Sequence, residues 1–158
     1  MNKPASLNFI RQELANLSSK QLQELCLKLA RYKKDNKELL AYLLFEADDE
    51  LAFINRVKDE IKKQFTEINT SQVFFIRKSI RKILRNVNKY VRYAGNKRIE
   101  AELLIFFCSC LNESGIDFRS VPSLQNLYQN QLLKIKKTVA SLHEDLQYDY
   151  RTEIDRLL

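Results

Sequence analysis

Glycine and proline are almost absent from this chain: its 158 residues include two of each. Sheet proteins need these residues at their many tight turns, because Gly supplies positive φ angles and Pro pre-sets a turn angle. A chain poor in both, and rich in Leu, Lys, Glu, Gln and Arg, is typical of an all-α protein. The length and the 45% hydrophobic content favour a single helical domain spanning residues 1–158.

The same scarcity excludes several kinds of site. Gly95 and Gly115 are isolated, so the chain has no glycine-rich phosphate loop and no nucleophile elbow. Its single histidine, His143, excludes the paired-histidine motifs of zinc and di-iron enzymes. No set of nucleophile, base and orienting residue can be assembled. We therefore expect a protein that is not an enzyme and that uses no cofactor and no metal.

Cysteine usage and hydropathy bear on location. The three cysteines, Cys26, Cys108 and Cys110, suit a reducing compartment better than a disulfide-stapled secreted domain. Cys108 and Cys110 point apart on one helix and are interpreted as inert packed thiols. The most apolar run, Leu103 to Leu111, has nine residues, whereas a membrane span needs about 20. Residues 1–6 contain no apolar signal segment. We expect a soluble cytoplasmic protein.

Apolar residues at helical spacing predict seven or eight helices joined by short loops. The predicted ranges are about 6–17, 19–32, 36–44, 50–68, 71–94, 97–114 and 122–157. Capping-box patterns begin at Ser18 and Asp35, and a third at Ser141 would divide the last range into two helices. The helices are expected to pack as antiparallel hairpins, in a closed bundle or a short irregular α-superhelix.

Two of these ranges have distinctive faces. Leu103 to Cys108 is apolar on every side, so the helix over 97–114 is predicted to be the central one. The helix over 71–94 has a single apolar face instead, formed by a and d positions of successive heptads: Val73, Ile76, Ile80, Ile83, Val87, Tyr90 and Ala94. This series can pack within the domain or close a homodimer.

The positive charge of the chain is concentrated in one segment. Residues 68–99 contain no Asp or Glu and nine cations, whereas the rest of the chain holds 18 basic and 20 acidic side chains. We call the nine cations the basic ridge: Arg77, Lys78, Arg81, Lys82, Arg85, Lys89, Arg92, Lys97 and Arg98. Those in the helix over 71–94 lie opposite the apolar face, apart from Arg77 on its flank. They extend along a helix roughly 36 Å long.

Two interpretations of the basic ridge remain open. Phosphate contact needs cations in a row and gives affinity without sequence choice, so the ridge can bind nucleic acid, with Phe75 and Tyr93 nearby to stack on bases. Alternatively, the ridge is a solvated face, or one neutralised inside the chain. Two acidic groups are available for that: Glu46, Asp48, Asp49 and Glu50, and, near the C-terminus, Glu144, Asp145, Asp149, Glu153 and Asp155.

The N-terminal segment carries a resemblance. The stretch from Glu13 to Leu22, with its Leu-Ser-x-x-x-Leu phrase, and the stretch from Lys37 to Phe45 resemble the start of uncharacterised bacterial all-helical families of unknown function. The similar region covers about a quarter of the chain. The resemblance implies helical hairpins and no assigned activity.

These patterns support two functional hypotheses. The first is a non-enzymatic helical interaction or adaptor module that binds a protein partner, a homodimer being one form of it. The second is a nucleic-acid-binding protein that uses the basic ridge. The second predicts binding that weakens steeply with salt, and the first does not.

Overall fold

The computed structural model describes residues 4–158. The expectation that residues 1–6 form no signal segment therefore lies partly outside the described residues. Within residues 4–158 the protein is all-α, as predicted, with eight α-helices and one short 3₁₀ turn. The chain divides into two compact units, residues 1–45 and 46–158. The single domain over residues 1–158 expected from the sequence stays a prediction.

The N-terminal unit contains α1 (Leu7–Ala15), α2 (Ser19–Tyr32) and α3 (Lys34–Phe45). The predicted capping box of α2 is confirmed, since Ser18 accepts from the Gln21 backbone and Gln21 accepts from the Ser18 backbone. The capping box at Asp35 is wrong. Lys33 is extended and its carbonyl accepts from the Asn36 and Lys37 backbones, so α3 begins at Lys34 and Asp35 lies in its first turn.

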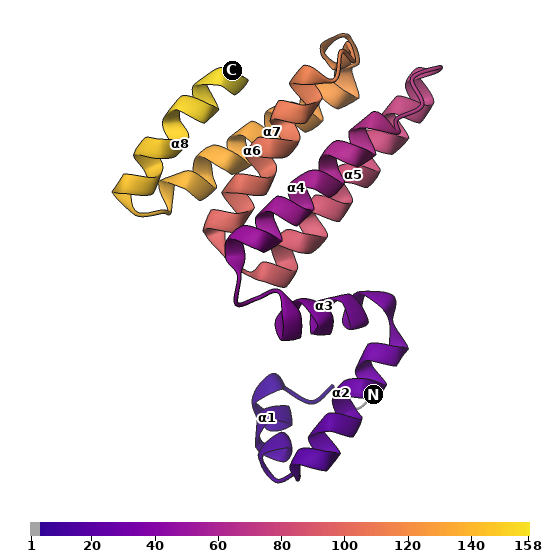
Figure 1. Ribbon diagram of the computed structural model, residues 1–158, viewed down its shortest axis with the longest axis vertical. Helices are drawn as coiled ribbons and strands as arrows, with labels where there is room; N and C mark the ends of the chain where they lie inside the picture. Colours follow the sequence, from indigo (N-terminus) through magenta and orange to yellow (C-terminus); the bar gives the residue numbers. More distant parts are fainter. Residues whose placement is uncertain (1–3) are drawn as a thin grey trace. The chain divides into compact units, whose positions relative to one another are not determined.

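The C-terminal unit contains α4 (Glu50–Thr66), α5 (Val73–Ala94), α6 (Lys97–Glu113), a 3₁₀ turn (Phe118–Ser120), α7 (Pro122–Ala140) and α8 (Glu144–Leu157). Helix α6 contacts α4, α5, α7 and α8, as Figure 1 shows. Leu103, Leu104, Phe107, Cys108 and Leu111 of α6 have no solvent exposure. The sequence-based prediction of a central helix over 97–114 is therefore confirmed.

Helix boundaries follow local chemistry. Gly95 ends α5 with a left-handed φ of 59°, and Gly115, at 73°, follows α6, a conformation that costs glycine little. Pro122 is the first residue of α7, where its missing N–H costs nothing. The range 122–157 does form two helices. The cap of α8 is His143, whose Nδ1 accepts from the Asp145 backbone, rather than Ser141.

No helix in residues 4–158 combines the length and the apolarity that crossing a bilayer requires.

Candidate nucleic-acid interface

Helix α5 positions most of the basic ridge. Its buried residues, Ile80, Ile83, Leu84, Val87 and Val91, hold it against α4 and α6. Leu84 and Val91 lie at e positions of the heptads, so the buried stripe is centred between a and e rather than between a and d. Val73, which begins the predicted series, is exposed. Because the stripe is buried, the opposite face of α5, which carries the cations, points away from its neighbours.

Six ridge cations make no ion pair with any described residue: Arg77, Lys78, Arg81, Lys82, Arg85 and Arg92. The other three have neighbours. The Lys89 ammonium lies 5.3 Å from the centre of the Tyr90 ring. Lys97 pairs with Glu100 at 2.9 Å, and Arg98 lies 3.6 Å from Glu50.

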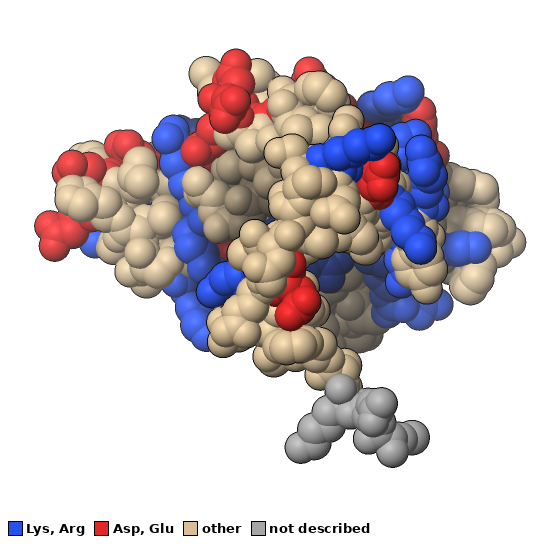
Figure 2. All heavy atoms as spheres, turned by 90° about the horizontal axis from the view of Figure 1, so that it is seen from below, with Lys and Arg blue, Asp and Glu red and all other residues tan. Residues whose placement is uncertain are grey.

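Among the described residues, one acid of the two predicted acidic groups pairs with the ridge. Helix α8, which carries the C-terminal acids, packs on α6 and α7, and among the described residues none of those acids pairs with the ridge. Glu46 binds Arg56 of α4, so of the first acidic group Glu50 alone reaches the ridge, at Arg98. Figure 2 shows basic side chains gathered in bands on the face that it presents.

A groove of about 360 Å³ runs along the first half of the ridge. It is lined by four cations, Arg77, Lys78, Arg81 and Arg85, and by Phe74. Positions 74, 78, 81 and 85 are spaced by four, three and four residues, so they lie on one line along the helix. Phe74 is 59% exposed. An exposed ring beside a row of cations is the kind of arrangement that single-strand-binding proteins use to stack bases and hold phosphates.

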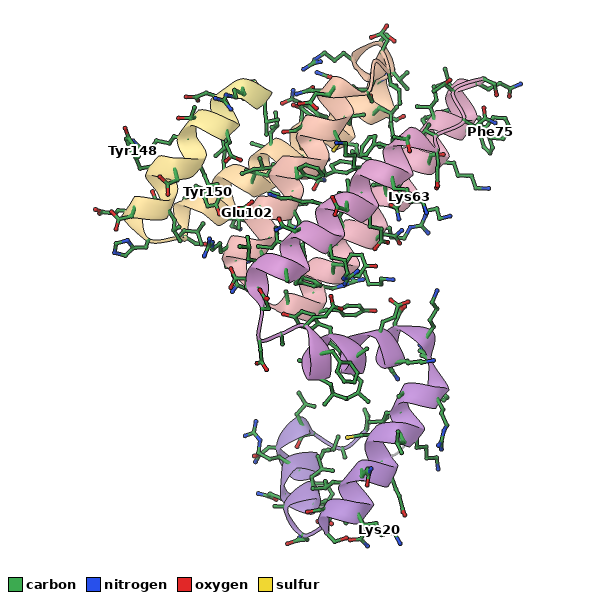
Figure 3. The ribbon with its side chains drawn as sticks, viewed as in Figure 1. Lys20, Lys63, Phe75, Glu102, Tyr148 and Tyr150 are labelled. Atoms are coloured by element: carbon green, nitrogen blue, oxygen red, sulfur yellow. The ribbon has the colours of Figure 1, made fainter. Side chains whose placement is uncertain are left out.

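The aromatic residues proposed from the sequence have different places. Phe75 is 38% exposed and lies near the start of α5 (Figure 3). Its ring is edge-on to that of Phe74, with the ring centres 5.6 Å apart. Tyr93 is half-buried and its ring is edge-on to Tyr90. Sequence reasoning missed Phe74, although its spacing to Lys78, Arg81 and Arg85 was a usable signal.

A polar network links α5 to α4. The Tyr90 hydroxyl donates to Glu60 of α4 at 2.8 Å, and Arg56 binds both Glu46 and Glu60. Burial, followed by the hydrogen bond to Glu60, raises the pKa of Tyr90 to about 12. This tyrosine is therefore neutral at physiological pH and acts as a donor that fixes α5 to α4.

A second network ties α6 to α4 and α8. Glu102 accepts from Lys58 of α4 and from the Tyr150 hydroxyl of α8, each at 2.8 Å; Tyr150 and Glu102 are labelled in Figure 3. Burial alone would raise the pKa of Glu102, but the hydrogen bonds from Lys58 and Tyr150 outweigh it and the pKa is lowered. Glu100, held by Lys97 and Lys134, also has a lowered pKa despite burial. Both carboxylates are held in ion pairs at neutral pH.

These carboxylates predict an acid-dependent stability. A carboxyl whose pKa is lowered by folding contributes stability above its ordinary pKa, 4.5 for both residues, and loses it as the pH falls. We expect the urea midpoint of the wild type to fall below about pH 5. Glu102→Gln should cost roughly 1–3 kcal/mol at pH 7 and make the acid decline shallower. The exposed Glu113→Gln of the same helix is the control, and equal behaviour of the two variants would contradict the assignment.

The other residues considered from the sequence are His143 and the cysteines of α6, Cys108 and Cys110. His143 is exposed at the start of α8, 3.4 Å from Asp145. Burial raises the pKa of the Cys108 thiol to about 12, and burial followed by Glu113 raises that of Cys110 to about 11, which disfavours the reactive thiolate of both. Within residues 4–158, no three His, Cys, Asp or Glu side chains gather as metal ligands would.

No protein-family model, curated protein or solved structure matches this chain. The resemblance of the N-terminal segment to uncharacterised bacterial helical families therefore stays a prediction.

Proposed function

We propose that this protein binds single-stranded nucleic acid along the exposed face of α5. The observation that carries the proposal is the absence of ion-pair partners, among the described residues, for six of the nine ridge cations. Unpaired cations hold only water and counterions, so a phosphate backbone can replace the counterions at little cost.

The groove supports a single strand over a duplex. Phe74 can stack on a base only where the base is unpaired, and the cations beside it can hold the adjoining phosphates. From Phe74 to Arg92 the helix rises about 27 Å. That length accommodates roughly eight stacked nucleotides at about 3.4 Å each. Contacts to phosphates and base faces carry no sequence code, so we expect binding with little sequence preference.

A salt titration tests this function. With about five phosphates contacted, the affinity for a single strand of about 16 nucleotides should fall roughly a hundredfold between about 50 and 200 mM salt. Fluorescence anisotropy with an internally labelled strand measures the affinity, and a duplex of the same sequence should bind more weakly. Absent binding, or binding that salt leaves unchanged, would reject the proposal.

A second candidate function, protein interaction, is favoured by the N-terminal unit. Tyr42 is the one buried residue among residues 4–45, while the large apolar side chains that remain exposed there are Leu7, Phe9, Ile10, Leu14, Leu22, Leu25, Leu27, Leu29, Tyr32, Leu43, Leu44 and Phe45. An exposed apolar surface of this kind marks an interaction site. The occupant we propose is a second copy of the same unit, because two copies cover each other's apolar faces at once.

A further inference from the structure

A second hollow, of about 490 Å³, lies where α5 turns into α6 and α7 passes beside it. Its polar lining comes from three helices and the turn: Asn88 and Arg92 of α5, Asn96 of the turn, Lys97 and Glu100 of α6, and Lys134 of α7. The volume lies within the range of small-ligand pockets, about 300–1,000 Å³. Arg92 belongs both to this hollow and to the basic ridge, so the two are continuous.

Glu100 organises the cations of this hollow. Its side chain is 9% exposed, and its two oxygens lie 2.9 Å from the Lys97 Nζ and 3.3 Å from the Lys134 Nζ. Lys134 also donates to the Asn88 Oδ1, at 3.2 Å. Two lysines from different helices are thus held at the wall of the hollow before any ligand arrives, which reduces the entropy lost on binding.

The chemistry of the lining selects an anion. Both oxygens of Glu100 are already in ion pairs with Lys97 and Lys134, and the amide oxygen of Asn88 accepts a hydrogen bond from Lys134. The hydrogen-bonding groups that can still serve a ligand are donors: the ammonium groups of Lys97 and Lys134, and the guanidinium of Arg92. Arg92 has no ion pair among the described residues. Three cations against one carboxylate leave two positive charges. A phosphate monoester carries about −1.5 to −2 at pH 7, against −1 for a backbone diester.

We propose that this hollow binds a terminal phosphate monoester, so that the protein recognises the phosphorylated end of the strand that lies along α5. This inference rests on the proposed function for its source of phosphate. A free mononucleotide presents the same group, and the experiment separates the two sources. Strand ends that carry only a hydroxyl leave Lys97 and Lys134 without an anion and bind through α5 alone.

The test compares single strands of one sequence with a 5′-phosphate, a 3′-phosphate or hydroxyls at both ends. We expect one phosphorylated strand to bind about tenfold more tightly than the hydroxyl strand, equivalent to about 1.4 kcal/mol. Lys134→Gln should abolish this preference and leave the affinity for the hydroxyl strand unchanged, because Lys134 lies outside the ridge. Lys136→Gln, an exposed lysine of the same helix, is the matched control and should retain the preference.

The outcomes separate the two proposals. Equal, salt-dependent binding of all three strands overturns the terminal site and leaves strand binding by α5 intact. Calorimetry with a nucleoside monophosphate supplies the other arm. Suppose that the wild type binds the mononucleotide, that Lys134→Gln abolishes this binding, and that no strand binds. This result supports the phosphate site and contradicts the proposed function. Absence of binding by the strands and by the mononucleotide overturns both.

Discussion

The triple substitution Lys78→Glu, Arg81→Glu and Arg85→Glu is expected to weaken single-strand binding by about a hundredfold or more at about 0.1 M salt. These three residues line the groove with Phe74 and make no ion pair with a described residue. Each reversal removes an attraction to phosphate and adds a repulsion. All three side chains are exposed, so the fold should be retained, and circular dichroism with the urea midpoint verifies this.

The control for this variant carries the same change in net charge at other sites. Lys136→Glu, Arg151→Glu and Arg156→Glu alter exposed residues of α7 and α8, and α8 packs on α6 and α7. If binding reflects only the overall charge of the protein, the two variants lose affinity equally. The proposed interface requires that the control lose far less.

The second large effect concerns the N-terminal unit. We expect the wild type to sediment at about twice its 18.7 kDa. Each large apolar side chain fully removed from water contributes about 1.5–3 kcal/mol, and twelve such side chains are exposed in residues 4–45. Even partial burial of this set offsets the about 4–15 kcal/mol that association costs.

The double substitution Leu29→Asp and Leu44→Asp is expected to give the mass of one chain, because it places two carboxylates in an apolar interface. Both leucines are more than 60% exposed, so neither supports the core of the unit as described. Leu133→Asp, at an equally exposed leucine of α7, should leave the mass at two chains. A wild type that sediments as one chain at every concentration would contradict the homodimer.

Much of the C-terminal unit could be predicted from the sequence because its signals are local. The all-round apolar stretch from Leu103 to Cys108 indicated the central helix, and Gly95 and Pro122 marked helix ends where their backbone preferences require them. The basic ridge was visible as 32 residues without an acid. The helix ends and the basic ridge both depend on residues that are close in the sequence, so a single sequence is enough to predict them.

The features that sequence reasoning missed depend on packing between distant segments. Lys134 of α7 pairs with Glu100 of α6, so its place at the hollow beside α5, α6 and α7 cannot be predicted from sequence spacing. Whether the acids of α8 neutralise the ridge depended on which helices α8 packs against. The apolar face of α5 includes Leu84 and Val91 because a straight helix turns every 3.6 residues, not every 3.5. The exposure of the N-terminal leucines could not be predicted either, because an amphipathic pattern is the same whether or not another segment covers its apolar face.

The most direct test of the account is the slope of log affinity against log salt for a single strand, measured for the wild type and the triple ridge variant. The proposed interface predicts a wild-type slope of about −3 to −4, because each contacted phosphate of a single strand contributes about −0.7. Loss of three contacts should bring the variant to about −1 to −2. A wild-type slope near zero, or equal slopes for the wild type and the variant, would show that α5 does not hold the phosphate backbone.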